Sequence, residues 1–245
     1  MRSLSNLLAA ACALCAMAAH AQTPAAPPGA LPTVEVKAAR TRLLPYKDLF
    51  YPMAKAVQTS LAGRAALAVQ LRPARPGVRT DDLSVWLEGG GEALPVHANE
   101  HGLYIVPVAD RIAQQEGSFS INKNPSDLRA NLVLIPTLPL EAWTIGEVRR
   151  LLHDVHAALD PLVPWHLRLL MWASMRKLGV WVCSLSPSAH VDVVDDGRLL
   201  ASYPTSEPMR NHANSPVYCH RFTGNEDFDP RARLVLPEDA QVLLI

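Results

Sequence analysis

Residues 67–73 read LAVQLRP, and residues 181–187 read WVCSLSP. In both stretches apolar side chains stand at every second position and a proline ends the run. This pattern predicts a β-strand with one buried face, followed by a turn. The two stretches lie at the same place in two longer segments with similar landmarks. We therefore predict that one strand-rich unit occurs twice, from about residue 45 to 136 and, in shortened form, from about 164 to 237.

The other landmarks recur in the same order around the two strands. Each of them is common at turns or strand ends, so the prediction depends on their shared order and spacing. The first segment has Pro45, Asp81, His97, Ala98, Asn99, Tyr104, Asp127 and Arg129, and the second has Pro164, Asp195, His212, Ala213, Asn214, Tyr218, Asp229 and Arg231. A repeat of this length is a domain and not a short solenoid module. The alternative is two unrelated strand-rich domains that use the same turn residues.

The N-terminus has the features of a secretory signal peptide. Arg2 precedes an apolar run over residues 7–19, and Ala19-His20-Ala21 fits a signal-peptidase site. Cleavage after Ala21 removes residues 1–21 and leaves Gln22 as the first residue of the mature chain. We therefore expect a periplasmic protein, exported with its signal peptide removed.

Two other interpretations of this N-terminus fit less well. The apolar run is shorter than the ~20 residues that a membrane-spanning helix needs, and no later apolar run is long enough. Lipoprotein cleavage before Cys12 would leave almost no apolar segment upstream. Residues 22–42 are rich in proline and alanine at their start, which is typical of a spacer that buries too little apolar surface to fold.

The charges of the chain are balanced and scattered. Lys and Arg number 23, Asp and Glu number 23, and the formal net charge is therefore zero. Basic stripes that follow a nucleic-acid backbone are missing from the sequence, so nucleic acid is not an expected partner. The length and the 49% hydrophobic content allow one large or two small domains with real cores.

One helix is predicted between the two units. Thr144 stands three residues before Glu147, as in a capping box, and apolar residues follow at helical spacing up to Leu159. We interpret residues 138–160 as an amphipathic helix that bridges the units.

The fold class predicted is α+β, with two related strand-rich units over residues 43–137 and 161–245. Each unit is led by a helix, the first beginning or kinking at Pro52 and the second running from Pro164 to Gly179. The predicted strands are 66–72, 83–88, 94–97, 103–106, 118–121, 131–135, 180–185, 191–194, 199–203, 217–222, 233–236 and 242–245.

Cys183 and Cys219 are the cysteines that remain after signal cleavage. In the repeat alignment they replace Val69 and Ile105, two apolar positions on strands expected to be neighbours. Export favours a disulfide between them, because oxidised cysteines persist outside the cytoplasm. The alternatives are two buried free thiols or a redox pair, although a redox pair usually has the Cys-x-x-Cys spacing.

His190 and Asp192 are two residues apart on a predicted strand, so both side chains point to the same face. They could form part of an acid–base or metal pair, or simply a polar outer face. On the predicted connecting helix His153 and His156 could bind a metal, but Arg149 lies one turn before His153. A guanidinium there disfavours a divalent cation, so no metal site is predicted.

The sequence His-Ala-Asn occurs at residues 97–99 and 212–214. Its presence in both units favours a structural role, because asparagine accepts the left-handed backbone conformation of turns. A binding site around the second copy is the alternative. Its candidate binding residues are His212, Asn214, Tyr218, His220 and Arg221.

Sequence motifs of serine hydrolases, zinc proteases, P-loops and dinucleotide-binding folds are missing from the chain. We therefore expect a non-enzymatic binding or interaction protein of the cell envelope, without a cofactor. Its partner would be an envelope protein or a small periplasmic ligand. The alternative is a periplasmic hydrolase whose candidate acid–base residues are His190, Asp192 and His212.

Overall fold

Antiparallel strands make up most of the part of the chain that the structure describes. The computed structural model describes residues 40–163 and 178–245, which belong to one unit, Ala38–Ile245. The predicted signal peptide, nearly all of the predicted spacer and most of the helix predicted from Pro164 lie outside these residues. The described fold mixes strands with fewer helices and is therefore α+β, as predicted.

None of the helices in residues 40–163 and 178–245 combines the length and the apolar character needed to cross a membrane.

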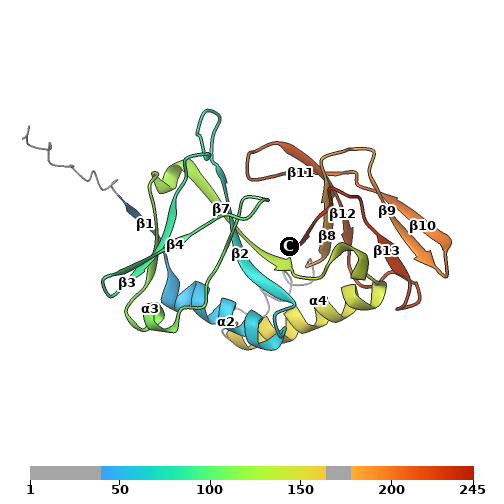
Figure 1. Cartoon of the computed structure of the whole chain (residues 1–245), viewed down its shortest axis with the longest axis horizontal. Coiled ribbons are helices and arrows are strands. Elements are labelled where there is room, and N and C mark those ends of the chain that lie inside the picture. The colour runs from blue at the N-terminus through green and yellow to red at the C-terminus, as the bar shows by residue number, and fades with distance from the viewer. Residues whose placement is uncertain (1–39, 164–177) are drawn as a thin grey trace, which may run out of the picture. The chain divides into compact units, whose positions relative to one another are not determined.

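The largest sheet has seven strands and includes strands from both halves of the chain (Figure 1). Its order is β11-β12-β8-β14-β7-β2-β5, and each neighbouring pair is antiparallel. The strands are β2 (Ala65–Pro73), β5 (Leu103–Ile105), β7 (Leu128–Pro136), β8 (Val180–Ser184), β11 (Glu207–Arg210), β12 (Pro216–Phe222) and β14 (Gln241–Leu244). Strand β7 meets β14 in the middle, where Leu134 lies opposite Leu244. This pairing joins the two halves.

Two smaller sheets each belong to one half. The first has the order β1-β6-β3-β4 and the second has the order β10-β9-β13. Their strands are β1 (Thr41–Pro45), β3 (Val85–Gly89), β4 (Glu92–Val96), β6 (Ser118–Ile121), β9 (His190–Asp195), β10 (Arg198–Pro204) and β13 (Arg233–Val235).

The strand pairing of the first half recurs in the second half. Strand β2 lies between β5 and β7, and β8 lies between β12 and β14. Strand β3 lies between β4 and β6, and β9 lies between β10 and β13. The hairpins β3–β4 and β9–β10 both turn through two residues with positive φ, Gly90-Gly91 and Asp196-Gly197. Strand β11 is the one strand of the second half without a counterpart in the first.

Helices α2 (Tyr51–Ser60) and α4 (Ile145–Leu159) hold corresponding places. Strand β1 pairs with β6 and leads through the π-helical turn η1 (Tyr46–Phe50) into α2 and then β2. Thr144 forms a bridge to Arg233 of β13, the counterpart of β6, and leads into α4. The two helices pack against each other (Figure 1). A bridging role for α4 is therefore not confirmed, because α4 occupies in the second half the place that α2 occupies in the first.

The helix ends follow the sequence signals. Thr144 caps α4, since its hydroxyl accepts a hydrogen bond from the backbone N–H of Glu147 at 3.1 Å. Pro52 lies in the first turn of α2, where its missing N–H costs nothing. The remaining helical segments are α3 (Asp110–Gln114) and the 3₁₀ turns η2 (Pro125–Asp127), η3 (Leu140–Ala142) and η4 (Asp160–Leu162).

The apolar core is continuous through both halves. Val85 and Leu67 from facing sheets of the first half belong to the same buried cluster as Val182 and Val191 from the second half. The buried faces of α2 and α4 belong to this cluster as well. Because fully burying one such side chain stabilises a protein by about 1.5–3 kcal/mol, the shared core binds the halves to each other.

Two of the matched landmarks occupy different places in the two halves. Asp81 lies in the loop before β3, whereas Asp195 ends β9 at the next hairpin turn. Residues 127–134 lead into β7, whereas residues 229–236 lead into β13, the counterpart of β6. The alignment was wrong at these points because aspartate is frequent at every kind of turn, and alternating apolar residues follow it in many strands.

The alignment of β2 with β8 was wrong about the face of β8 that meets the main core. Leu67, Val69 and Leu71 belong to the main core, as do Val180 and Val182, whereas Cys183 belongs to a separate cluster, so Cys183 is not the counterpart of Val69. Both faces of these central strands are covered by apolar groups, so the alternating pattern does not reveal which set of positions faces the main core.

The predicted disulfide between Cys183 and Cys219 is confirmed. The two residues are directly opposite on β8 and β12, with Cα atoms 4.0 Å apart and an S–S distance of 2.06 Å. The sequence alignment matches them with Val69 and Ile105, which are not opposite each other on β2 and β5. Ile105 is 46% exposed, so the expectation that both positions hold buried aliphatic residues was wrong for Ile105. A disulfide fits an extracellular or periplasmic protein.

Three elements were missed by the sequence analysis: β1, β11 and α3. Strand β1 begins at Thr41, inside the predicted spacer 22–42. Strand β11 is a four-residue edge strand that contains Pro208, a residue that argues against a strand unless the strand lies at an edge. Helix α3 has five residues, too few for a periodic apolar pattern to be recognised.

Removal of the disulfide should lower the stability of the fold markedly. The bond closes a loop with a sequence separation of 36 residues, for which the chain-entropy relation gives about 3–4 kcal/mol. We expect Cys183→Ala and the double variant Cys183→Ala/Cys219→Ala to lose this free energy of unfolding in urea titrations. Val217→Ala, a truncation in the same small cluster, is the control. A loss no larger than that of the control would contradict a stabilising disulfide.

Candidate binding site

A cavity with polar and apolar walls lies at one end of the first half. It has a volume of about 530 Å³ and is called here the main cavity. Its walls come from the end of β2, the loop from β2 to β3, the start of β3, the end of β4, the turn before β5 and the turn between β11 and β12. The lining residues are Leu71, Thr80, Asp81, Leu83, Ser84, Val85, Trp86, Pro95, Val96, His97, Ala98, Asn99, Glu100, Gly102, Tyr104, His212 and Ala213. This volume is typical of small-molecule sites.

A five-residue turn before β5 forms one wall of the main cavity. The side-chain oxygen of Asn99 accepts hydrogen bonds from the backbone N–H groups of His101, at 3.0 Å, and Leu103, at 2.9 Å. The N–H of Gly102 donates to the Asn99 carbonyl at 2.9 Å. Gly102 has φ +68, a left-handed conformation in which glycine avoids the cost of a Cβ atom.

The turn between β11 and β12 has the same hydrogen bonds. The side-chain oxygen of Asn211 accepts from the N–H groups of Ala213 and Ser215, both at 3.0 Å. Asn214 donates its N–H to the Asn211 carbonyl at 3.0 Å and has φ +61. Asn211 is therefore the counterpart of Asn99, and Asn214 is the counterpart of Gly102. The matching of His-Ala-Asn at 97–99 with 212–214 was wrong by three residues, although the structural role predicted for an asparagine in each turn holds.

The two turns touch each other through His212 and Gly102. A Cβ atom built on Gly102 would lie 2.1 Å from Cγ of His212, so only a glycine lets the imidazole approach this backbone. Nδ1 of His212 is buried and has no hydrogen-bond partner among the described residues. Strands β5 and β12 are separated by four strands in the seven-stranded sheet. The sheet must therefore curl for turns near its opposite edges to meet.

A second cavity of about 340 Å³ lies on the other side of this contact. It shares Glu100 and His212 with the main cavity. Its floor includes Cys183 of the disulfide and Gln241, whose Nε2 is buried without a partner among the described residues. Asp239 on its wall accepts hydrogen bonds from the Ser184 hydroxyl and the Leu185 N–H, both at 2.9 Å.

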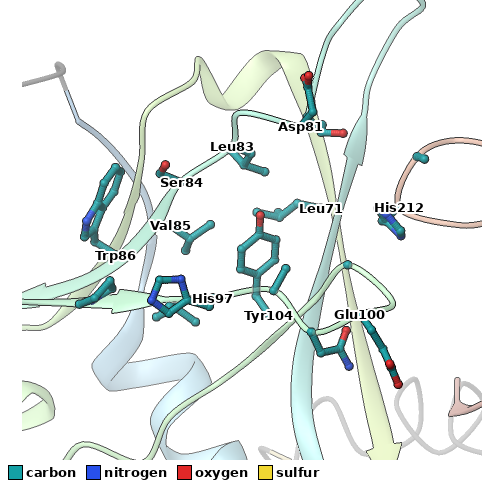
Figure 2. A pocket seen from close by; sticks show the side chains of 17 residues that line it. Leu71, Asp81, Leu83, Ser84, Val85, Trp86, His97, Glu100, Tyr104 and His212 are labelled. Atoms are coloured by element: carbon teal, nitrogen blue, oxygen red, sulfur yellow. The ribbon is translucent and has the colours of Figure 1, made fainter.

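Aromatic rings stand along the length of the main cavity. Figure 2 shows the Tyr104 ring in the middle, with Trp86 at one end and His212 at the other. Burial raises the pKa of the Tyr104 phenol. Its hydroxyl has no hydrogen-bond partner among the described residues, so a ligand can use it. The guanidinium of Arg40 lies 4.2 Å from the centre of the Trp86 ring and covers one of its faces.

The acidic groups of the main cavity are Asp81 and Glu100. A hydrogen bond from Arg79 lowers the pKa of Asp81 to about 2, so its carboxylate is ionised at every physiological pH. Glu100 lies 3.5 Å from Nε2 of His101. The described residues that line the main and second cavities include neither Lys nor Arg.

The corresponding end of the second half is closed. The loop from β8 to β9 has five residues, 185–189, whereas the loop from β2 to β3 has eleven, 74–84. Thr205 follows β10 as His97 follows β4, but Thr205 is fully buried. Its N–H and hydroxyl donate to the Ala189 carbonyl at 2.9 and 3.0 Å. The short loop and the buried threonine fill the space that is open in the first half.

Of the predicted binding residues, the structure places His212 in the main cavity. His220 lies between the sheets of the second half, stacked on Tyr203 with ring centroids 4.6 Å apart. Tyr218 is two residues away on the same face of β12, whereas Arg221 lies on the other face, beside the Trp181 ring. Side chains alternate along a strand, so this run of polar residues divides between two faces. Asn214 is exposed in the turn.

The candidate acid–base residues do not come together. Asp192 accepts a hydrogen bond from the Ser202 hydroxyl at 2.5 Å on the outer face of the three-stranded sheet. His190 is exposed at the start of the same strand, β9. Neither lines the main or the second cavity, where His212 lies.

On α4, the carboxylate of Asp154 forms an ion pair with the guanidinium of Arg64. Arg149 donates hydrogen bonds to the carbonyls of Gly224 and Phe228 at 3.0 and 3.2 Å, and so holds the loop after β12. Within residues 40–163 and 178–245 there is no group of three or more side chains arranged to hold a metal ion.

Several cavity residues were missed by the sequence analysis or used only as landmarks, namely Asp81, Trp86, Glu100, Gly102 and Tyr104. They come from separate segments, and no local spacing connects them. One feature of the sequence could have indicated an open space in the first half: the segment between β2 and β3 is longer than the segment between β8 and β9.

No protein-family profile, no curated protein and no solved structure matches this chain. The function must therefore be inferred from the geometry of the cavities. The closed end of the second half provides an internal comparison for the open end of the first.

Replacing Gly102 by alanine should displace His212. Any alanine at a left-handed position costs about 1–2 kcal/mol, but only at Gly102 does the new Cβ meet an imidazole. Gly77→Ala is the control, because Gly77 has φ +86 and no neighbour within 4 Å. We expect Gly102→Ala to be the less stable variant in urea unfolding and to shift the NMR signals of the His212 ring. Equal stability of the two variants, with His212 signals unchanged, would refute the contact.

His220 should make the fold sensitive to mild acid. Burial lowers the pKa of His220 below the usual 6.5 of a histidine, because the charged imidazole is disfavoured between the sheets. The unfolded chain therefore takes up the proton first, and stability that is present above pH 6.5 falls as the pH drops towards the lower pKa of the folded state. We expect His220→Phe to reduce this loss in urea unfolding between about pH 7 and 5. The exposed His190→Gln should keep it.

Proposed function

We propose that this chain is an exported, non-enzymatic protein of the periplasm that binds a ligand in the main cavity. The observation that carries this proposal is the difference between the two halves. The same strand pairing ends in a closed, hydrogen-bonded plug at Thr205 in one half and in a 530 Å³ cavity in the other. A longer loop keeps the first end open, which supports a role for the space itself.

The walls of the cavity support binding in a second way. The turn that carries His212 belongs to the second half, yet it completes a cavity of the first half. It is held in place by the Asn211 hydrogen bonds and by β12, which the disulfide ties to β8. A site whose wall is fixed in this way is preorganised, so a ligand loses little free energy in ordering it.

The halves are, in this proposal, two copies of one unit. The recurring strand pairing, the corresponding positions of α2 and α4, and the identical hydrogen bonds of the turns at Asn99 and Asn211 support a duplication. The first copy then kept an open end for the ligand. In the second copy the residues before the turn form the strand β11, and the turn reaches the first copy.

Export is supported by the disulfide and by the signal-peptide features of the sequence. The confirmed bond between Cys183 and Cys219 is expected in an oxidising compartment. Cleavage after Ala21 and residence in the periplasm remain predictions of the sequence. N-terminal sequencing of the exported protein decides the cleavage site.

Catalysis is not supported by the positions of the candidate acid–base residues. Asp192 and His190 lie on β9, and His212 lies at a turn of the other sheet, without a shared cavity. A general acid and base must both reach the same substrate atoms within hydrogen-bond distance. The arrangement therefore favours binding over hydrolysis.

Filling the main cavity should abolish ligand binding. Ala213 is exposed and lines the cavity, so Ala213→Trp should block it without disturbing the core. We expect a panel of neutral oligosaccharides, amino acids, polyamines and dicarboxylates to contain a ligand that shifts the backbone NMR signals of the lining residues. That shift should vanish in Ala213→Trp. Ala93→Trp, on the exposed edge strand β4 outside the cavity, should retain it. A panel that leaves the lining signals of the native protein unchanged would argue against the proposed function.

A further inference from the structure

We propose that the ligand is an uncharged oligosaccharide that spans the main and second cavities across the contact of His212 with Gly102. This inference rests on the proposed function and adds to it the chemical class and the length of the ligand. Three observations carry it: the shared wall of the cavities, the state of their charged groups, and the mixture of hydrogen-bonding groups around them.

The first observation is that the two cavities border the same two side chains. Glu100 and His212 line both, and they are at the end of the main cavity opposite Trp86 (Figure 2). A ligand that fills only the main cavity leaves the second one unused on the far side of His212. A linear molecule that lies across this contact uses both, with volumes of about 530 and 340 Å³.

The second observation is the set of charged groups in the cavities, where two of the three carboxylates already accept hydrogen bonds. Asp81 accepts from Arg79, Asp239 accepts from Ser184 and Leu185, and Glu100 lies beside His101. An anion would meet three carboxylates without any Lys or Arg among the described lining residues, which disfavours it. The charges thus disfavour an anionic ligand, and the choice of an uncharged ligand over a cation rests on the hydrogen-bonding groups and the aromatic rings.

The third observation is the kind of polar atom that remains without a partner. Two buried atoms are of this kind: Nε2 of Gln241 is a donor, and Nδ1 of His212 donates or accepts according to its tautomer. Buried polar atoms of this kind normally have a partner, so their position in two adjoining cavities indicates where ligand atoms bind. Sugar hydroxyls both donate and accept, and they occur all along an oligosaccharide.

The aromatic rings agree with a sugar. The C–H faces of a pyranose are apolar and pack on aromatic rings, and Tyr104 and His212 follow one another along the main cavity (Figure 2). An extended peptide would instead pair with a free strand edge. The edge strands near the two cavities offer little to an added strand: β4 and β11 contain Pro95 and Pro208, which cannot donate, and β5 has three residues.

The test is calorimetric titration of the full mature protein with maltohexaose, cellohexaose and chitohexaose, each beside its own disaccharide. We expect one hexasaccharide to bind at least tenfold more tightly than its disaccharide. Leu185→Trp fills the second cavity from a position that is 64% exposed, so folding should not be affected. It should remove the tenfold advantage and leave the affinity for the disaccharide unchanged. Gln241→Ala should lower the affinity for the hexasaccharide severalfold. Gln114→Ala, at an exposed position of α3, should leave this affinity unchanged.

Other outcomes overturn the inference. Equal affinity for hexasaccharide and disaccharide refutes the use of both cavities. Binding of spermidine, a lysine-rich peptide or hexagalacturonate, with no neutral hexasaccharide bound, refutes the sugar; the proposed function survives if Ala213→Trp abolishes that binding. If neither the sugars nor these three probes bind, the inference fails, and the proposed function then depends on the amino acids and dicarboxylates of the panel given above.

Discussion

The pairing of β7 with β14 holds the two halves of this protein together. Leu134 and Leu244 lie opposite each other at the centre of the seven-stranded sheet, and strands of the first half lie on one side of this pair and strands of the second half on the other. Below the sheet the two halves share one apolar core. Neither half can therefore move freely against the other, and a site built from both halves keeps its geometry.

The curl of the seven-stranded sheet follows from this junction. Sheets twist because of the chirality of their residues, and the twist accumulates over successive strands. With four strands between β5 and β12, the curl brings the turns at Asn99 and Asn211 into contact. That contact requires Gly102, because a side chain there would occupy the space of the His212 ring. The two cavities are the spaces left on each side of it.

The two halves share one scheme of strand pairing but differ at one end, which is open in the first half and closed in the second. In the second half the short loop after β8 and the buried Thr205 satisfy their polar groups internally. In the first half the longer loop leaves an open space, and Nδ1 of His212 is buried beside it without a partner among the described residues. Buried polar groups without partners are costly, so those that persist next to a cavity have a stronger claim to a functional role than an exposed histidine such as His190.

The sequence by itself determined the strands with clear alternation, the cap of α4 at Thr144 and the bond between Cys183 and Cys219, because each depends on local periodicity or on residue chemistry. It also indicated that the second half resembles the first. Only the tertiary structure decided which face of β8 meets the core, since apolar residues cover both faces of a central strand. It also decided that Asn211 and not Asn214 corresponds to Asn99, because aspartate and asparagine recur at many turns. The main cavity lay beyond the sequence altogether, because its walls come from four separate stretches of the chain, around Leu71, 80–86, 95–104 and 212–213, which come together only in the folded structure.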